Sequence, residues 1–436
     1  MKKTILAIAA LAVTLPALSQ SVKPSIEVHG FIRNYYAYDS RQMIGLTEDF
    51  FTYVPYDVKL ASNGDDVNGY PNFRFAALTS RLWVEVKGYE VEGWKVGARV
   101  EGDFYNGLGT DKVTGTANFR LRQAFVTMSK GGWNFKAGQS WHPMAADMPD
   151  VFSLNTGAPF GPFSRTPLVQ AEYKLTDEIS FTAAALWQMQ YTSNGPEGKS
   201  AKYIKYGNTP EIYGGVNFRS DGFLMRVGLD MLSIKPVLSD NLGFRTDRIT
   251  TVTPFFYTQY AKDLFSVKFK TVFAEAGDHV NLNGGYGVSA VDKYGNYEYT
   301  PTRNSSSWVS LCYGKKVQAI LFAGYVKNFG TEKPLVALSD LSGVTSESDY
   351  FWFSGNSFSN MNSMWRVTPT VIYNLGKVAF GLEYEVTSVQ YGKKTDSYDK
   401  DNKVYTNNIN RKTGLYDTGL HWVTNHRVQG LIKYTF

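Results

Sequence analysis

Hydrophobic and polar positions alternate with a period of two in short runs from Ile26 to Phe436. The last run, HRVQGLIKYTF, carries aliphatic, aromatic or glycine residues at every second position and ends the chain on an aromatic residue. A period of two places successive side chains on opposite faces of a β-strand. The pattern predicts an all-β protein whose C-terminus lies inside a strand, where most soluble proteins have a polar tail.

Two kinds of connection alternate between the predicted strands. One kind is tight and carries the Gly, Asp and Asn residues that supply the unusual φ angles of a hairpin. The tight turns lie at 87–94, 129–133, 175–179, 219–223, 261–265, 313–317 and 374–378. The other kind is long and polar. The long loops lie at about 40–72, 107–117, 142–166, 193–208, 234–246, 277–304, 328–362 and 392–418.

These seven tight turns and eight long loops join about sixteen strands. Short turns on one side and long loops on the other are typical of an outer-membrane barrel. The predicted fold is a transmembrane antiparallel up-and-down β-barrel with short periplasmic turns and long extracellular loops. A β-sandwich with solvated outer faces is the alternative, but a sandwich rarely alternates short and long connections so regularly.

Charged residues keep to one face of the predicted strands. In WKVGARVEGDFY (94–105), Arg99, Glu101 and Asp103 share a face, while Val100 and Phe104 lie on the other. An Arg or Lys on a lipid-exposed face at mid-depth costs about 2–4 kcal/mol. The charged face is therefore expected to line a water-filled lumen.

Lipid cannot satisfy an unpaired backbone N–H or C=O group, so an open sheet edge is excluded from the membrane. The first strand, SIEVHGFIRNYYAYD, must then pair with the last one. This requirement explains why the chain ends in a strand. Tyr434 and Phe436 are expected at the membrane–water boundary, together with aromatic residues that flank the tight turns.

The first residues, MKKTILAIAALAVTLPALSQ, have the layout of an export signal. Lys2 and Lys3 precede an apolar stretch that is too short to span a bilayer, and small residues follow it. We expect a signal peptide at 1–19, cleaved after Ser19, and a barrel over 20–436; an uncleaved anchor is the alternative. The chain holds one cysteine, Cys312, so no intrachain disulfide is possible.

Composition and motifs argue against other classes of function. The net charge of +6, which includes the two signal lysines, is too small for a nucleic-acid-binding face. None of the five histidines stands at a metal-binding spacing with Cys, Asp or Glu. No phosphate loop, nucleophile elbow or dinucleotide fingerprint is present. His421 and His426 with Asp417 could suggest a barrel enzyme, but we expect no catalytic site, metal or cofactor.

One stretch carries a more specific resemblance. FRLRQAFVTMSKGGWNFKAGQSWHPM (119–144) combines an Arg-rich strand, a Gly-Gly turn and a Gly-Gln-Ser-Trp strand end, and NTGAPFGPFSRTP (155–167) leads into the next strand. With the export signal and the terminal Phe, this resembles the general porins of Gram-negative outer membranes, in particular the trimeric DcaP-like porins. The layout covers the whole mature chain, whereas the specific motif covers about 50 residues.

The resemblance implies a homotrimer in the outer membrane, with one pore per subunit and with Phe436 read by the barrel-assembly machinery. In such porins the loop after the fifth strand folds into the barrel and narrows it. By strand count this loop is 142–166, whose prolines favour one stiff shape. The resemblance also leaves open whether the loops at 328–362 and 392–418 cover the mouth.

Basic residues on the first five strands are expected to face this loop across the pore. The predicted pore-lining residues are Arg33, Arg81, Arg99, Arg120, Arg122 and Lys136 from the strands, Asp147 and Asp150 from the loop, and Arg165 at its exit. A basic wall opposite an acidic loop would set up a transverse field, and rings of Arg favour anions. Glu85, Glu101 and Asp103 dilute the excess, so only a mild anion preference is expected. Alternatively, salt bridges of these arginines merely brace the wall.

The sequence thus predicts a passive diffusion channel for small hydrophilic solutes. A substrate-selective channel for anionic small molecules such as dicarboxylates is the second hypothesis, and an enzyme barrel is a distant third. The solute itself cannot be read from the sequence.

Overall fold

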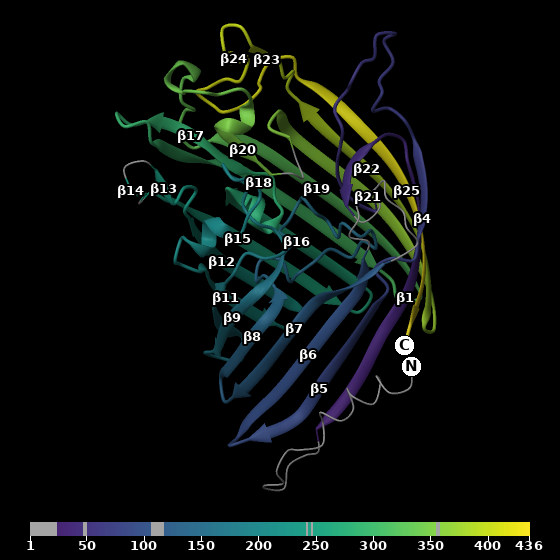
Figure 1. The fold of residues 1–436 in the computed structure, drawn as a ribbon. Helices are drawn as coiled ribbons and strands as arrows, with labels where there is room; N and C mark the ends of the chain where they lie inside the picture. Colours follow the sequence, from purple (N-terminus) through teal and green to yellow (C-terminus); the bar gives the residue numbers. More distant parts are fainter. Residues whose placement is uncertain (1–23, 47–49, 106–116, 241–242, 246, 355–357) are drawn as a thin grey trace, which may run out of the picture.

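The computed structural model describes residues 24–46, 50–105, 117–240, 243–245, 247–354 and 358–436 (Figure 1). Within these ranges sixteen antiparallel strands form a closed barrel, as predicted. No helix in the described part of the chain is long and apolar enough to cross a membrane. The predicted signal peptide at 1–19 lies outside the described residues.

The strands of the barrel wall follow one another in chain order. They are β1 (Ser25–Asp39), β5 (Arg81–Val91), β6 (Trp94–Tyr105), β7 (Asn118–Lys130), β8 (Trp133–Trp141), β9 (Arg165–Lys174), β10 (Ile179–Leu186), β11 (Glu211–Ser220), β12 (Phe223–Ile234), β15 (Ile249–Lys262), β16 (Phe265–Glu275), β18 (Tyr297–Tyr313), β19 (Val317–Thr331), β21 (Met361–Leu375), β22 (Val378–Tyr391) and β25 (His421–Thr435). The short strand β4 (Asn72–Ala76) continues the line of β5 along β1.

Every predicted tight turn joins two strands that pair with each other. The β5–β6 turn shows why the sequence signal works. Glu92 and Gly93 both have positive φ angles, of 51° and 77°, as a two-residue hairpin turn of type I′ requires. The tight turns gather at one end of the barrel and the long loops at the other (Figure 1).

Side chains alternate between the two faces of the wall. In β5, Leu82 and Val84 are exposed on the outside, whereas Arg81 and Glu85 lie against the lumen and pair with charged residues of β6. The same alternation leaves Val100 and Phe104 of β6 exposed. The outer surface is therefore apolar over the height that lipid would cover, and the interior is polar.

The barrel closes between its first and last strands. β1 pairs with β25 from Phe31 opposite Thr435 to Asp39 opposite Arg427. Phe436 continues this ladder, since its N–H donates to the Gly30 carbonyl at 3.0 Å and its carbonyl accepts the Gly30 N–H at 3.2 Å. The Phe436 ring lies directly over Gly30, where a Cβ atom would come within 2.5 Å of it. The terminal strand is thus held to its last residue.

The first long connection departs from the prediction of an extracellular loop over 40–72. It contains the hairpin β2 (Met43–Leu46) and β3 (Phe51–Pro55), which turns into the barrel and buries Phe50, Tyr53 and Val54. Buried arginines of the wall hold it: Arg366 donates to the Tyr53 carbonyl at 3.0 Å, and Arg427 donates to Thr52 Oγ1 at 2.8 Å. This hairpin and the loop after β8 therefore both lie in the lumen.

The extracellular loops are packed structures. β17 (Gly285–Val291) pairs with β18 and with β20 (Phe351–Phe353), so loops 277–304 and 328–362 share one small sheet. An apolar cluster beneath them also includes residues of loop 392–418. β18 begins at Tyr297 and β19 continues to Thr331, so these strands extend beyond the predicted boundaries of 304 and 328.

The remaining elements are short. The hairpins β13 (Ser239–Asp240) with β14 (Gly243–Phe244), and β23 (Asp396–Asp399) with β24 (Val404–Asn407), lie within the long loops. The helical turns are α2 (Lys202–Lys205), η1 (Gly277–Val280), η2 (Leu338–Asp340) and η3 (Glu347–Asp349).

Deletion of Phe436 should weaken closure of the barrel. The deletion removes both backbone hydrogen bonds to Gly30, which together are worth about 1–3 kcal/mol. We expect a lower urea midpoint for the barrel refolded in detergent, measured by the heat-sensitive gel shift. Phe436→Ala keeps the backbone bonds and should cost less than the deletion. An unchanged midpoint after the deletion would show that the last residue does not stabilise the seam.

Candidate functional site

The loop between β8 and β9 crosses the lumen. It comprises residues 142–164, because β9 already begins at Arg165. Met144, Ala145 and Phe160 within it are fully buried, and the loop packs against wall strands from the far side of the barrel. The loop after the fifth strand therefore folds inward, as the resemblance to general porins implied.

The first half of the loop is held by cations of the opposite wall. Arg226 Nε of β12 lies 2.9 Å from Asp147 Oδ2, and Lys268 of β16 forms an ion pair with Asp150. Lys270 Nζ of the same strand donates to the Met144 carbonyl at 2.8 Å. The acids of the loop thus face away from the arginines of β1 and β5–β7.

The second half of the loop is held by β21, β22 and β1. Glu383 accepts a hydrogen bond from the Phe152 amide at 3.1 Å, and Glu385 accepts one from the Asn155 side-chain amide at 3.1 Å. The Tyr35 hydroxyl donates to the Phe152 carbonyl at 3.0 Å. Arg366 donates to the Ala158 carbonyl at 3.0 Å, so the arginine that holds the first hairpin also holds this loop.

A cavity of about 480 Å³ remains between the loop and the basic wall. The cations that line it are Arg33, Arg81, Arg120, Arg122, Arg165 and Lys199. The loop contributes small and apolar side chains, among them Ala146, Met148 and Phe163. No carboxylate stands among the described residues that line the cavity.

Two buried carboxylates of β6 lie behind the cations. Arg122 bridges them, with 2.7 Å to Glu101 Oε1 and 2.7 Å to Asp103 Oδ2. Arg120 Nε lies 3.0 Å from Asp103, and Arg81 lies 3.4 Å from Glu101. Salt bridges therefore brace this part of the wall, as the alternative interpretation held. Arg99 also pairs with Glu101, so four guanidinium groups share these two carboxylates and positive charge remains in excess.

Arg33 and Arg165 add to this excess. Arg33 donates to the Thr79 hydroxyl at 2.8 Å, and no ion pair joins it to a carboxylate of the described chain. The guanidinium carbon of Arg165 lies 4.7 Å from the centre of the Trp141 ring. Its Nη1 atom is buried and has no hydrogen-bond partner among the described residues. Such a donor at a cavity wall suits an anionic ligand.

Lys199 comes from the loop between β10 and β11. Burial at the cavity lowers the pKa of its ammonium group, and the charge of Asp278 opposes this effect. Burial also raises the pKa of the Asp278 carboxyl, although the Asn194 amide donates to it at 3.0 Å. Lys199 is thus a cation whose charge is poorly solvated.

The structure brings together five of the nine predicted pore residues: Arg33, Arg81, Arg120, Arg122 and Arg165. The other four do not line the cavity. Arg99 pairs with Glu85 and Glu101, and the ammonium of Lys136 lies 5.3 Å from the centre of the Phe125 ring. Asp147 and Asp150 hold the loop to the opposite wall.

Sequence reasoning missed Lys199, Tyr105, Gln190 and Tyr191, which also line the cavity. Gln190, Tyr191 and Lys199 follow β10 in an irregular segment without periodicity, so no strand pattern could point them inward. Tyr105 ends β6 on the parity of the charged face and could have been found.

The residues of the enzyme hypothesis are not assembled. His421 lies 2.6 Å from Asp57, and Asp417 accepts a hydrogen bond from Asn410 at 2.6 Å. His426 bonds to the Tyr384 hydroxyl at 2.8 Å.

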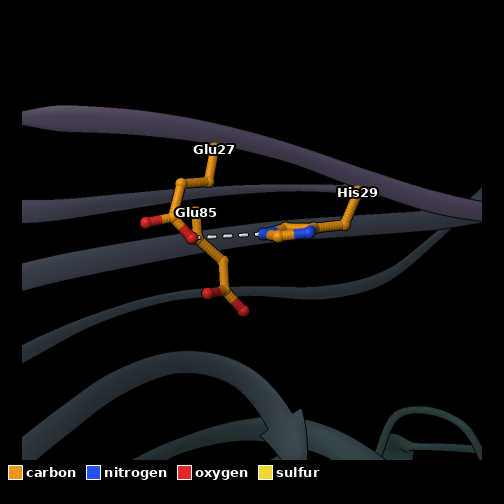
Figure 2. Close-up of side chains that lie close together, drawn as sticks. All are labelled: Glu27, His29 and Glu85. Carbon is orange, nitrogen blue, oxygen red and sulfur yellow. Dashed lines mark hydrogen bonds and ion pairs between the residues drawn. The ribbon is translucent and has the colours of Figure 1, made fainter. Parts of the chain in front are cut away.

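Two groups of His and carboxylate side chains are close enough to share a metal ion. One consists of Glu27, His29 and Glu85 near the tight-turn end of β1 and β5 (Figure 2). Lys87 Nζ lies 2.9 Å from both Glu27 and Glu85, so an ammonium group is already paired with these carboxylates. The other consists of His142, Glu211 and Asp230, which the sequence spacing did not suggest.

No protein-family model matches the sequence, and no curated protein sequence matches it. Solved structures do. The outer-membrane channel DcaP of Acinetobacter baumannii superposes with a TM-score of 0.64 and 17% identity, over 97% of this chain and 100% of that one. The anion-selective porin of Comamonas acidovorans gives a TM-score of 0.50 and 11% identity, over 95% and 100%.

The trimer form of OmpT, an outer-membrane protein of Vibrio cholerae, also gives a TM-score of 0.50 and 11% identity, over 95% of this chain and 99% of that one. At these identities the similarity concerns the fold. The chain therefore has the fold of the Gram-negative general porins.

Proposed function

We propose that this chain is an outer-membrane porin, a water-filled channel for passive diffusion of small hydrophilic solutes with a mild anion preference. The observation that supports the preference is the cavity beside the inward loop, which six cations and no described carboxylate line. Rings of Arg favour anions in pores of this kind. An anion-selective porin shares the fold.

The anion preference arises where the inward loop faces the basic wall. The apolar and small residues of the loop form one side of the cavity, and the arginines of β1, β5 and β7 form the other. A transverse field between a basic wall and an acidic loop is not part of this proposal, since Asp147 and Asp150 are paired with the opposite wall. The excess positive charge on one side acts on a passing ion instead.

A second candidate is a substrate-selective channel for anionic small molecules such as dicarboxylates. The observation in its favour is that Arg33 and Arg165, neither of which is paired with a carboxylate in the described chain, line one cavity. Two such guanidinium groups could each take one carboxylate of a substrate. Block of the chloride current by succinate, but not by acetate at equal ionic strength, would favour this candidate over general diffusion.

The proposal includes the setting of the channel. We propose that the chain is exported by the signal at 1–19 and inserted by the barrel-assembly machinery, which reads Phe436. The barrel then contacts outer-membrane lipid and assembles as a homotrimer. No cofactor is required, because diffusion through a preformed channel needs only the lumen.

Arg33→Gln with Arg165→Gln should reduce the anion preference. A unit charge about 7 Å from an ion in water is worth about 0.6 kcal/mol, so each lost charge should lower the local anion concentration about threefold at low salt. The measurement is the reversal potential across a planar bilayer under a potassium chloride gradient. Lys136→Gln removes a charge that lies outside the cavity and should shift the potential less. Equal shifts in the two variants would place the selectivity elsewhere.

Asp147→Asn with Asp150→Asn should loosen the loop. These substitutions free Arg226 and Lys268, so the lumen gains positive charge while the first half of the loop loses its anchors. We expect a larger and noisier unitary conductance together with a stronger anion preference. Glu178→Gln in an exposed tight turn is the control and should behave as the wild type. Wild-type conductance in the double variant would mean that these ion pairs do not fix the bore.

The proposed homotrimer can be checked on the purified protein. In mild detergent without heating, light scattering corrected for bound detergent should give three times the mass of one chain. Heating should convert this species to single chains on a gel. A chain mass before heating would contradict the trimer and leave the channel proposal to the bilayer measurements.

A further inference from the structure

Four ionisable side chains meet in the lumen beside the start of the inward loop. His142 directly follows β8, Glu211 begins β11, Asp230 lies in β12 and His279 lies in η1. The side chains of all four are between 1% and 3% exposed. They come from four separate parts of the chain, which is why no spacing in the sequence revealed them.

Each imidazole lies between 2.7 and 3.6 Å from both carboxylates. His142 Nε2 lies 2.7 Å from Glu211 Oε1 and 3.6 Å from Asp230 Oδ1. His279 Nε2 lies 3.5 Å from Glu211 Oε1 and 3.4 Å from Asp230 Oδ2. Ligands about 2.0–2.1 Å from a tetrahedral zinc ion are about 3.4 Å apart. His142, Glu211 and Asp230 each offer a ligand atom within 4.8 Å of the other two, whereas His279 does not belong to this group. These three side chains are therefore close enough to share one metal ion.

The balance of charge within the cluster favours a bound cation. No Lys or Arg of the described chain forms an ion pair with Glu211 or Asp230. Asp230 Oδ1, which is buried and directed toward the cluster, has no hydrogen-bond partner among the described residues. With both nitrogens of His279 donating, the cluster holds one positive and two negative charges, and the uncompensated negative charge is costly away from water. A bound cation would balance it.

The imidazole of His279 is placed to hold Asp230. Its Nδ1 donates to the Ala276 carbonyl at 3.1 Å and its Nε2 donates to Asp230 Oδ2 at 3.4 Å, since a carbonyl and a carboxylate can only accept. A metal-binding carboxylate commonly has such a hydrogen-bond partner behind it.

His142 differs, because its Nδ1 lies 3.2 Å from the Met144 amide nitrogen, which donates to it. This contact places the imidazole proton on Nε2, where it faces Glu211. Coordination through Nε2 would move the proton to Nδ1 and end the contact with Met144. Metal binding would thus act directly on the first turn of the inward loop.

We propose that His142, Glu211 and Asp230 bind a divalent transition-metal ion of the zinc type. One imidazole nitrogen and two carboxylate oxygens suit zinc, whereas calcium and magnesium prefer oxygen ligands alone. The ion would fasten the start of the inward loop to β11 and β12, while His279 of η1 holds Asp230. Its role would be structural, since it would join the loop to the wall.

The cluster of Glu27, His29 and Glu85 provides an internal control (Figure 2). It also contains one histidine and two carboxylates, but it is partly exposed and Lys87 is paired with both acids. A metal ion there would have to displace the ammonium group. We therefore expect no tight binding at this cluster.

The test uses the full-length barrel refolded in detergent. Refolding leaves behind the metal ions that accompany outer-membrane lipid. The protein is stripped with a chelator, equilibrated with zinc chloride, desalted and analysed by elemental mass spectrometry. We expect about one zinc ion per chain in the wild type and in His29→Ala. Asp230→Asn should retain less than a tenth of this amount.

Cobalt(II) supplies a second readout. Four-coordinate cobalt with nitrogen and oxygen ligands absorbs strongly in the visible range, and the wild type should show this spectrum. Folding of each variant is checked by the heat-sensitive gel shift, and Glu211→Gln serves if Asp230→Asn does not fold. Wild-type protein that takes up no zinc, or variants of the buried cluster that retain as much as the wild type, would overturn the proposal.

Discussion

A lipid environment offers no partner to a backbone N–H or C=O group, and this constraint governs the whole molecule. It requires the sheet to close, so β1 must meet β25 and the chain must end in a paired strand. Once the barrel is closed, alternation sends apolar side chains to the lipid and charged ones to the lumen. The interior is therefore the place where long polar and charged side chains must find partners, and the inward segments supply many of them.

The loop after β8 and the hairpin of β2 and β3 are held in the lumen by charged groups of the wall. Arg366 binds carbonyl groups of both segments, and Lys268 and Arg226 bind acids of the loop. The charged groups on one side of the lumen thus bind the loop. The other side, which includes Arg33 and Arg165, keeps a surplus of positive charge at the cavity. The charged residues that hold the loop and those that line the cavity thus lie on opposite sides of the lumen.

Much of this was accessible from sequence, because period-two alternation and turn chemistry are local signals. All seven tight turns, the closing strand pair and the inward direction of Arg81, Arg120 and Arg122 follow from them. The partners of Asp147 and Asp150 could not be predicted in this way, since ion pairs across a barrel depend on how the loop folds. The hairpin of β2 and β3 lies in a segment that the sequence predicted only as a long polar loop over 40–72. The cluster of His142 and His279 joins residues that are remote in the chain.

The central claim, a channel with an anion preference set by the cationic cavity, is tested most directly by the wild-type protein in a planar bilayer. Under a tenfold potassium chloride gradient we expect steady, ohmic single-channel steps, with a reversal potential displaced modestly toward the chloride equilibrium potential. A reversal potential on the potassium side, or the absence of any conducting steps from correctly folded protein, would contradict the claim.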